Sequence, residues 1–140
     1  MVISIIGFLA TASMVMLNNV RMKARDARRV GDIKQIQTAL ELYYDANNSY
    51  PNIVQSADHI NCENRFPTLD TYLGNYISVI PHDPLGPASR YCYYYNVKNS
   101  GQGYVIMAYQ VELTETAAKG EGTNCYPDTT NVYCKGVNYR

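Results

Sequence analysis

The sequence predicts an α+β fold: a long N-terminal α-helix whose C-terminal half packs on a small antiparallel β-sheet head. Residues 1–17 contain no charged side chain. Residues 20–44 continue with apolar side chains at three- and four-residue steps, as one face of a helix does. Residues 90–96 and 103–113 are rich in Tyr and β-branched residues, which favour strands. The 12 basic and 12 acidic residues in a chain of 140 exclude a globally basic nucleic-acid binder.

The apolar segment, residues 1–17, has three interpretations: a cleaved signal peptide, a buried core helix, or a retained helix covered by lipid or by other copies. A signal peptide normally begins with a charged region, which is absent. A body of about 90 residues is too small to surround a helix that is apolar on all sides. The retained helix is therefore favoured, and its 17 residues would span about 25 Å. The side chains that we expect to be covered in this way are Ile3, Ile5, Ile6, Gly7, Phe8, Leu9, Met14, Val15 and Leu17.

The helix is expected to continue without a break, since no Pro precedes Pro51. Gly31 is its weak point, because Gly costs about 1 kcal/mol relative to Ala inside a helix. Asn47 and Asn48 tolerate the left-handed backbone that ends helices, and Pro51 prevents continuation. We therefore divide the chain into a long helix over residues 1–48, hydrophobic over 1–20 and amphipathic over 21–48, and an α+β head over 49–140.

Six of the twelve basic residues lie between residues 21 and 34, directly after the apolar segment. This position favours a basic collar that lies at lipid headgroups and later pairs with carboxylates of neighbouring copies. An alternative is salt-dependent binding of DNA through Arg21, Arg25, Arg28 and Arg29. The predicted basic collar consists of Arg21, Lys23, Arg25, Arg28 and Arg29.

In the head, the sequence predicts a short helix over residues 68–76, strands over 90–96 and 103–113, and a short strand over 131–135. Along the second strand, alternate apolar residues share one face, and the opposite face becomes polar at Gln110 and Glu112. We expect the apolar face to pack on the amphipathic half of the helix. Its residues are Val105, Met107, Tyr109, Val111 and Leu113.

Four cysteines lie in the head, and none forms a CxxC motif. In a small, loop-rich head this pattern favours two disulfides and an oxidising compartment. Of the three connectivities we prefer Cys62–Cys92 and Cys125–Cys134, since the second closes a tail loop with little apolar content. Each bond would contribute about 2–4 kcal/mol.

No metal, cofactor or enzymatic activity is expected. A zinc site from His59, Cys62, His82 and Cys92 would have irregular spacing, so disulfides with surface histidines are favoured. No Ser or Cys has a recognisable catalytic context, and no phosphate-binding loop occurs. Calcium ligation is less favoured than simple solvation for the late carboxylates, which are Glu112, Glu115, Glu121 and Asp128.

Two stretches of the helix, VISIIGFLATASMV and ARDARRVGDIKQIQTALELYYDANNSYP, resemble the N-terminal helix of bacterial type IV pilins and type II secretion pseudopilins. The segments YLGNYISVIPHDPLG and YVIMAYQVEL are similar to the heads of the same families. The resemblance implies a subunit of a helical filament made of identical copies. It also implies a precursor in the inner membrane that a prepilin peptidase cleaves and N-methylates. A membrane machinery with its own ATPase then extrudes the subunit into the filament.

Members of these families usually begin with a Phe, several apolar residues and a Glu before the VISIIG-like run. Met1 lies inside that run. We therefore expect about seven further residues upstream, which would make the apolar segment long enough to span a membrane.

The function expected from the sequence is that of a structural subunit, a major pilin of a type IV pilus-like filament. Such a subunit is anchored in the inner membrane before assembly and lies on the cell surface afterwards. The alternatives are a pseudopilin of a type II secretion-like system and a pilin that takes up DNA.

Overall fold

The computed structural model describes residues 2–53, 67–86, 91–121 and 131–138, without the side chains of residues 2, 8–15, 67, 68 and 118. It confirms the predicted α+β fold. Its elements in chain order are α1 (Val2–Asn47), α2 (Pro67–Leu73), β1 (Cys92–Lys98), the 3-10 helix η3 (Asn99–Gly101), β2 (Gly103–Tyr109), α3 (Thr114–Ala118) and β3 (Val132–Val137).

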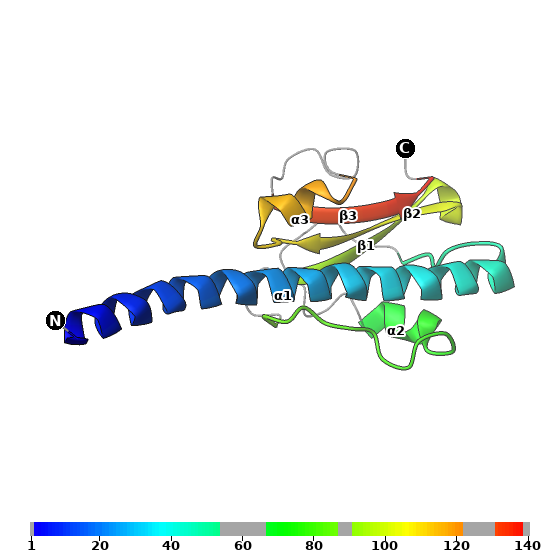
Figure 1. Ribbon diagram of the computed structural model, residues 1–140. Helices are drawn as coiled ribbons and strands as arrows, with labels where there is room; N and C mark the ends of the chain where they lie inside the picture. The colour runs from blue at the N-terminus through cyan, green and yellow to red at the C-terminus, as the bar shows by residue number, and fades with distance from the viewer. Residues whose placement is uncertain (1, 54–66, 87–90, 122–130, 139–140) are drawn as a thin grey trace.

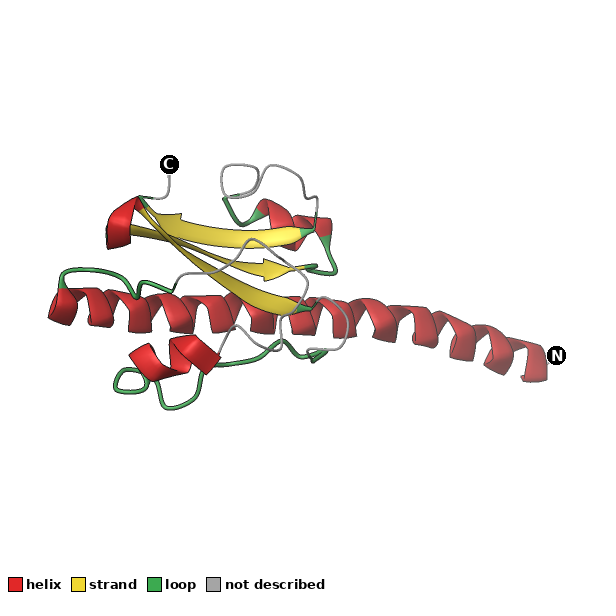
Figure 2. Ribbon diagram, turned by 180° about the vertical axis from the view of Figure 1, so that it is seen from behind, coloured by secondary structure: helices red, strands yellow, loops and turns green. Residues whose placement is uncertain are grey.

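Helix α1 is the longest element, and its 46 residues correspond to a rod of about 70 Å. Its C-terminal half lies between the sheet and α2, whereas its N-terminal half projects beyond the head (Figure 1). The view from behind shows the same arrangement, with all three strands on one side of the rod (Figure 2). The rod therefore belongs to the head over only part of its length.

The end of α1 agrees with the predicted stop. The helix ends at Asn47, and Asn48 has a left-handed φ of 55°. The Asn48 N–H donates to the Tyr44 carbonyl over 2.7 Å. Tyr50 then turns back towards the head, where its N–H donates to the Gly101 carbonyl over 2.8 Å.

The sheet is antiparallel throughout, with the order β1-β2-β3. In its register Tyr95 lies opposite Ile106, and Met107 lies opposite Cys134. Strand β2 is central, and all of its residues except Tyr109 are buried. Its two faces therefore contribute to two separate clusters of apolar side chains.

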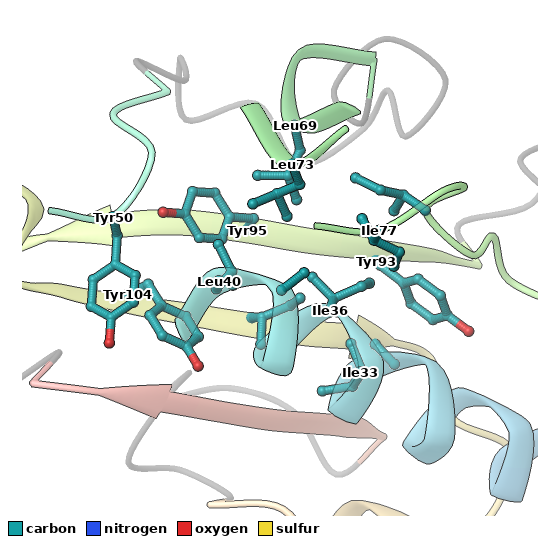
Figure 3. Close-up of a cluster of buried hydrophobic side chains, with 14 of the residues drawn as sticks. Ile33, Ile36, Leu40, Tyr50, Leu69, Leu73, Ile77, Tyr93, Tyr95 and Tyr104 are labelled. Atoms are coloured by element: carbon teal, nitrogen blue, oxygen red, sulfur yellow. The ribbon is translucent and has the colours of Figure 1, made fainter. Parts of the chain in front are cut away.

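The main core lies where α1 meets the sheet and α2. Ile33, Ile36 and Leu40 of α1 are fully buried, and they belong to one cluster with side chains of the sheet and of α2 (Figure 3). The tyrosines of this cluster bury their rings and direct their hydroxyls to polar groups. The Tyr93 hydroxyl donates to Asp32 over 2.6 Å, and the Tyr95 hydroxyl donates to the Pro51 carbonyl over 2.9 Å.

The predicted face of the second strand is wrong for Val105 and Met107, which pack in a smaller cluster with Val132 and Cys134. Of the predicted residues, Val111, which follows the strand, does join the α1 cluster. The strand residues that join this cluster are Tyr104, Ile106 and Ala108. Both faces of the central strand are apolar, so the alternation of residues did not distinguish them. The polar residues that seemed to mark an outer face, Gln110 and Glu112, follow the end of the strand.

The boundaries of several elements also differ from the predictions. Strand β2 ends at Tyr109 instead of continuing to Leu113, since Gln110 has a left-handed φ of 58°. The short helix α3 follows and was not predicted. The other predicted elements occur with shifts of up to three residues at their ends, as α2, β1 and β3.

Two glycines in different surroundings provide a test of the packing. A Cβ at Gly103 would collide with the Asn138 carbonyl oxygen and lie 2.6 Å from that of Val137, whereas a Cβ at Gly31 would have no neighbour within 4 Å. We expect Gly103→Ala to destabilise the protein by about 1–3 kcal/mol. Gly31→Ala should stabilise it by up to about 1 kcal/mol through helix propensity. Chemical denaturation of the full chain in detergent measures both values, and equal stabilities of the two variants would contradict this packing.

Candidate assembly site: the projecting helix and its anchor

The projecting half of α1 exposes apolar side chains. Ile3 is 86% exposed and Met16 is 73% exposed. Large apolar side chains with this degree of exposure are unusual together on a soluble monomer and mark a surface that another molecule covers. Of the side chains expected to be covered, those of Ile3, Ile5, Ile6 and Leu17 are all more than half exposed, and Gly7 is also exposed. The side chains of Phe8, Leu9, Met14 and Val15 lie outside the description.

Within the described residues, no helix has the length and the apolar character that a membrane crossing requires.

The projecting half joins the head at Arg29, whose side chain is fully buried. Its guanidinium forms a two-point contact with Asp83, through Nε to Oδ2 at 2.7 Å and Nη2 to Oδ1 at 3.0 Å. Its Nη1 donates to Asp26 Oδ1 at 2.6 Å and to Glu112 Oε1 at 3.1 Å. Its Cζ also lies 5.1 Å from the centre of the Tyr91 ring. We call Arg29 with Asp26, Asp83 and Glu112 the Arg29 anchor.

The carboxylates of the Arg29 anchor also bind the backbone of two head loops. Asp26 accepts the N–H groups of Glu112 and Leu113 at 3.0 and 2.9 Å. Asp83 accepts the N–H of Leu85 at 2.9 Å. One turn of α1 is thereby connected to the loop after α2 and to the loop after β2.

Arg25 extends the anchor by one helical turn. Its Nε and Nη2 donate to the two carboxylate oxygens of Glu112 at 2.6 and 2.5 Å. The hydrogen bonds from Arg25 hold the pKa of Glu112 below its usual range, and the bond from Arg29 acts in the same direction. Burial alone disfavours the charge of Arg29, but the hydrogen bonds to Asp83 and Asp26 raise the pKa of its guanidinium above the usual range.

The prediction of an exposed basic collar is wrong for Arg29, which is buried in the head. Arg25 is only partly exposed, because it is paired with Glu112. The remaining members are exposed: Arg21, Lys23 and Arg28. Lys23 lies 3.9 Å from Glu115, and Arg28 lies 3.9 Å from Asp32. The sequence contained the i,i+3 pair of Asp26 and Arg29, but it gave no signal that Asp83 and Glu112 would meet them.

The cysteines that the structure describes are consistent with an oxidised head. Cys92 and Cys134 are disulfide-bonded, and no described cysteine is free. Cys62 and Cys125 lie outside the described residues, so the preferred pairs Cys62–Cys92 and Cys125–Cys134 remain a prediction.

The residues considered as metal ligands are not brought together where the structure describes them. In the described ranges no group of three or more His, Cys, Asp or Glu side chains is arranged to hold a metal ion. His59 and Asp128 lie outside those ranges, and Glu112 belongs to the Arg29 anchor.

An exposed apolar helix that projects from a small α+β head defines the class of protein as a pilin-like subunit. The family model described as "Type II secretion system (T2SS), protein G" matches residues 15–122. The type II secretion system core protein G of Aeromonas hydrophila is 36% identical over 87 residues, which are 61% of each chain. The chain belongs to the protein G family of the type II secretion system. No solved structure matches the chain.

The Arg29 anchor predicts a large loss of stability when its cation is removed. Arg29→Met would leave three carboxylates without their shared partner, two of them buried, which costs about 3–5 kcal/mol. The matched control is Arg28→Met, because Arg28 is the adjacent arginine and its side chain is 64% exposed. We expect the control to change the free energy of unfolding by less than about 0.5 kcal/mol. Chemical denaturation measures both, and similar losses would contradict a structural role of Arg29.

The lowered pKa of Glu112 predicts an acid-sensitive contribution to stability. Because the folded state binds this proton more weakly than the unfolded state, the contribution is complete above the usual pKa of Glu. It is lost as the pH falls through the lowered pKa. We expect Glu112→Gln to be less stable than the parent at pH 7 and to lose less stability below about pH 4. Unfolding free energies measured from pH 7 to 2 test this, and parallel curves would refute it.

Proposed function

We propose that this protein is a pseudopilin, a structural subunit that polymerises with identical copies through the projecting half of α1. The observation that supports this most directly is the exposed apolar half of the helix, continuous with a folded head. Membership of the protein G family supports the secretion system as the setting. The aligned segment spans about three-fifths of the length of the Aeromonas hydrophila relative, and the function of the whole protein is therefore part of this proposal.

In this proposal the projecting half is first covered by the inner membrane and then by equivalent helices of neighbouring subunits. Exchange of lipid for protein gains little hydrophobic energy, so close packing, contacts between heads and the work of the machinery must drive assembly. The Arg29 anchor supports this scheme mechanically. It fixes the rod to the head at the point where the rod leaves it, so that force applied to either part reaches the other.

The comparisons favour the pseudopilin over the major pilin of a surface pilus, which was the first expectation from the sequence. We therefore propose a location at the periplasmic side of the inner membrane instead of the cell surface. The proposed partners are identical subunits, a prepilin peptidase and a platform with its assembly ATPase. We propose no enzymatic activity and no cofactor for the chain itself.

DNA uptake is the weaker alternative. Of the four arginines considered for DNA binding, Arg29 is buried and Arg25 is paired with Glu112. Only Arg21 and Arg28 of that set are well exposed. Two exposed arginines provide few phosphate contacts for salt-dependent binding.

A charged residue in the projecting half should block assembly. We expect Ile6→Asp to abolish filaments, because a carboxylate is costly both in lipid and between packed apolar helices. Ile6→Leu keeps the apolar character and should assemble normally. Electron microscopy of cells that overproduce the secretion machinery would reveal the filaments. Normal filaments of Ile6→Asp subunits would overturn the proposed function.

A further inference from the structure

A cleft of about 440 Å³ lies between α1 and α3, and its volume falls in the range of about 300–1,000 Å³ that is usual for small-molecule sites. One wall is the face of α1 from Lys23 to Val30, and the other is the segment from Leu113 to Lys119. We call this hollow the α1–α3 cleft. Helix α3 lies at the end of the head from which the rod projects (Figure 1, Figure 2). The cleft therefore lies beside the boundary between the head and the projecting half.

The cleft combines apolar walls with two exposed lysines. Ala27, Val30 and Leu113 supply the apolar side chains. Lys23 comes from α1 and Lys119 follows the end of α3, and both are exposed while they line the cleft. Apolar walls with a few polar groups at defined positions are typical of sites that bind a ligand with both apolar and charged parts.

Two carboxylates also line the cleft, but the cleft keeps a net positive charge. Asp26 is buried, and its carboxylate is already bonded to Arg29 and to two backbone N–H groups. Glu115 lies 3.9 Å from Lys23, and both of these side chains are more than half exposed. An exposed pair of this kind contributes little to stability, so a ligand can replace Glu115 beside Lys23 at low cost.

The hydroxyl of Thr116 provides an independent indication of a ligand. Thr116 is only 6% exposed, and it lines the cleft. Its backbone N–H donates to the Leu113 carbonyl over 3.0 Å, whereas its hydroxyl makes no hydrogen bond to any group in the described part of the chain. A buried hydroxyl without a partner is uncommon and costs free energy. The cleft thus offers a third donor beside the two ammonium groups.

We propose that the α1–α3 cleft binds the headgroup of an anionic phospholipid, of the phosphatidylglycerol class, while the subunit is in the membrane. The ammonium groups of Lys23 and Lys119 and the hydroxyl of Thr116 donate to the oxygens of the phosphodiester, and the apolar walls cover the adjacent glycerol carbons. The net positive charge of the cleft favours an anionic headgroup over a zwitterionic one. This inference rests on the proposed function, since it requires that lipid covers the projecting half.

The position of the cleft along the rod favours a lipid as the ligand. Val20 is the last large apolar side chain of α1 that is exposed before the cleft. Lys23 follows three residues later, which corresponds to about 4.5 Å along the helix. The headgroup layer of a bilayer is about 5–7 Å thick on each side of the hydrocarbon core. If the hydrocarbon ends at Val20, Lys23 lies inside this layer, and a bound headgroup would hold the subunit at one depth.

Photolabelling of the full chain in vesicles tests the site. The vesicles consist of phosphatidylcholine with a trace of phosphatidylglycerol that carries a diazirine on its headgroup, and mass spectrometry identifies the labelled peptides. We expect label in the peptide that contains Thr116, and excess unlabelled phosphatidylglycerol should remove most of it. Excess inorganic phosphate should leave the label in place, because it lacks the glycerol that the apolar walls cover. Phosphatidylcholine with the same diazirine should label this peptide weakly.

Variants separate the site from diffuse attraction to basic residues. Thr116→Val keeps the charge and should reduce the label several-fold without loss of folding stability, since the hydroxyl has no partner in the described chain to lose. Thr116→Ser keeps the donor and should retain the label. Lys119→Gln should reduce the label about fivefold. The matched control is Arg28→Gln, which removes an exposed charge of α1 outside the cleft and should leave the label nearly unchanged.

A photoreactive side chain in place of Ala27 identifies the occupant in cells. In cells that lack the assembly ATPase the subunit should stay in the membrane, and we expect the crosslinked species to be a phospholipid. A crosslink to a protein, including a second copy of the chain, would overturn the inference.

Three further results would also overturn it. Removal of the label by inorganic phosphate as effective as removal by phosphatidylglycerol would exclude a lipid as the specific ligand. Equal losses in Lys119→Gln and Arg28→Gln would indicate diffuse attraction only, and so would full label in Thr116→Val. All of these results leave the subunit in the membrane and the proposed function intact. A full chain that associates with vesicles of neither lipid composition would overturn both.

Discussion

The burial of one guanidinium among three carboxylates is the interaction on which the remaining structure depends. Arg29 is fully buried, and a buried charge is tolerated only when its partners satisfy it. Asp26, Asp83 and Glu112 do so from the helix itself and from two loops of the head. These bonds fix the positions of the two loops. They also fix the rotation of α1 about its own axis and its position along that axis relative to the sheet.

The sequence predicted the parts of the fold that depend on local pattern. The rod and its end near Asn47 follow from helical periodicity and from residues that stop helices. The face of β2 that packs on α1 was not predictable in this way, since both faces are apolar. The Arg29 anchor was not predictable either. Its partners Asp83 and Glu112 are 54 and 83 residues distant in the chain, and spacing alone does not indicate which loop meets which helical turn.

The abundance of tyrosine has a structural explanation within a single subunit. The chain has 14 Tyr and two Phe, and Tyr50, Tyr93, Tyr95 and Tyr104 are buried in the core. Hydroxyls of Tyr50 and Tyr104 donate to Glu41, and that of Tyr93 donates to Asp32. Burial and the bond to Asp32 raise the pKa of Tyr93 above the usual range, so its phenol stays neutral. Tyrosine thus fills the core while it satisfies carboxylates at the edge of the helix.

The unbroken rod also limits which insertions and deletions the chain tolerates. Each residue of an α-helix adds 100° of rotation and 1.5 Å of length. A single residue inserted between Leu17 and Asp26 would therefore turn the whole apolar half by 100° relative to the sheet, although it would alter no side chain. Seven inserted residues would turn it by only about 20°. Length variation in this segment should therefore occur in steps close to a whole number of helical turns, such as about 7, 11 or 18 residues, because only these steps keep the apolar half facing the same way relative to the sheet.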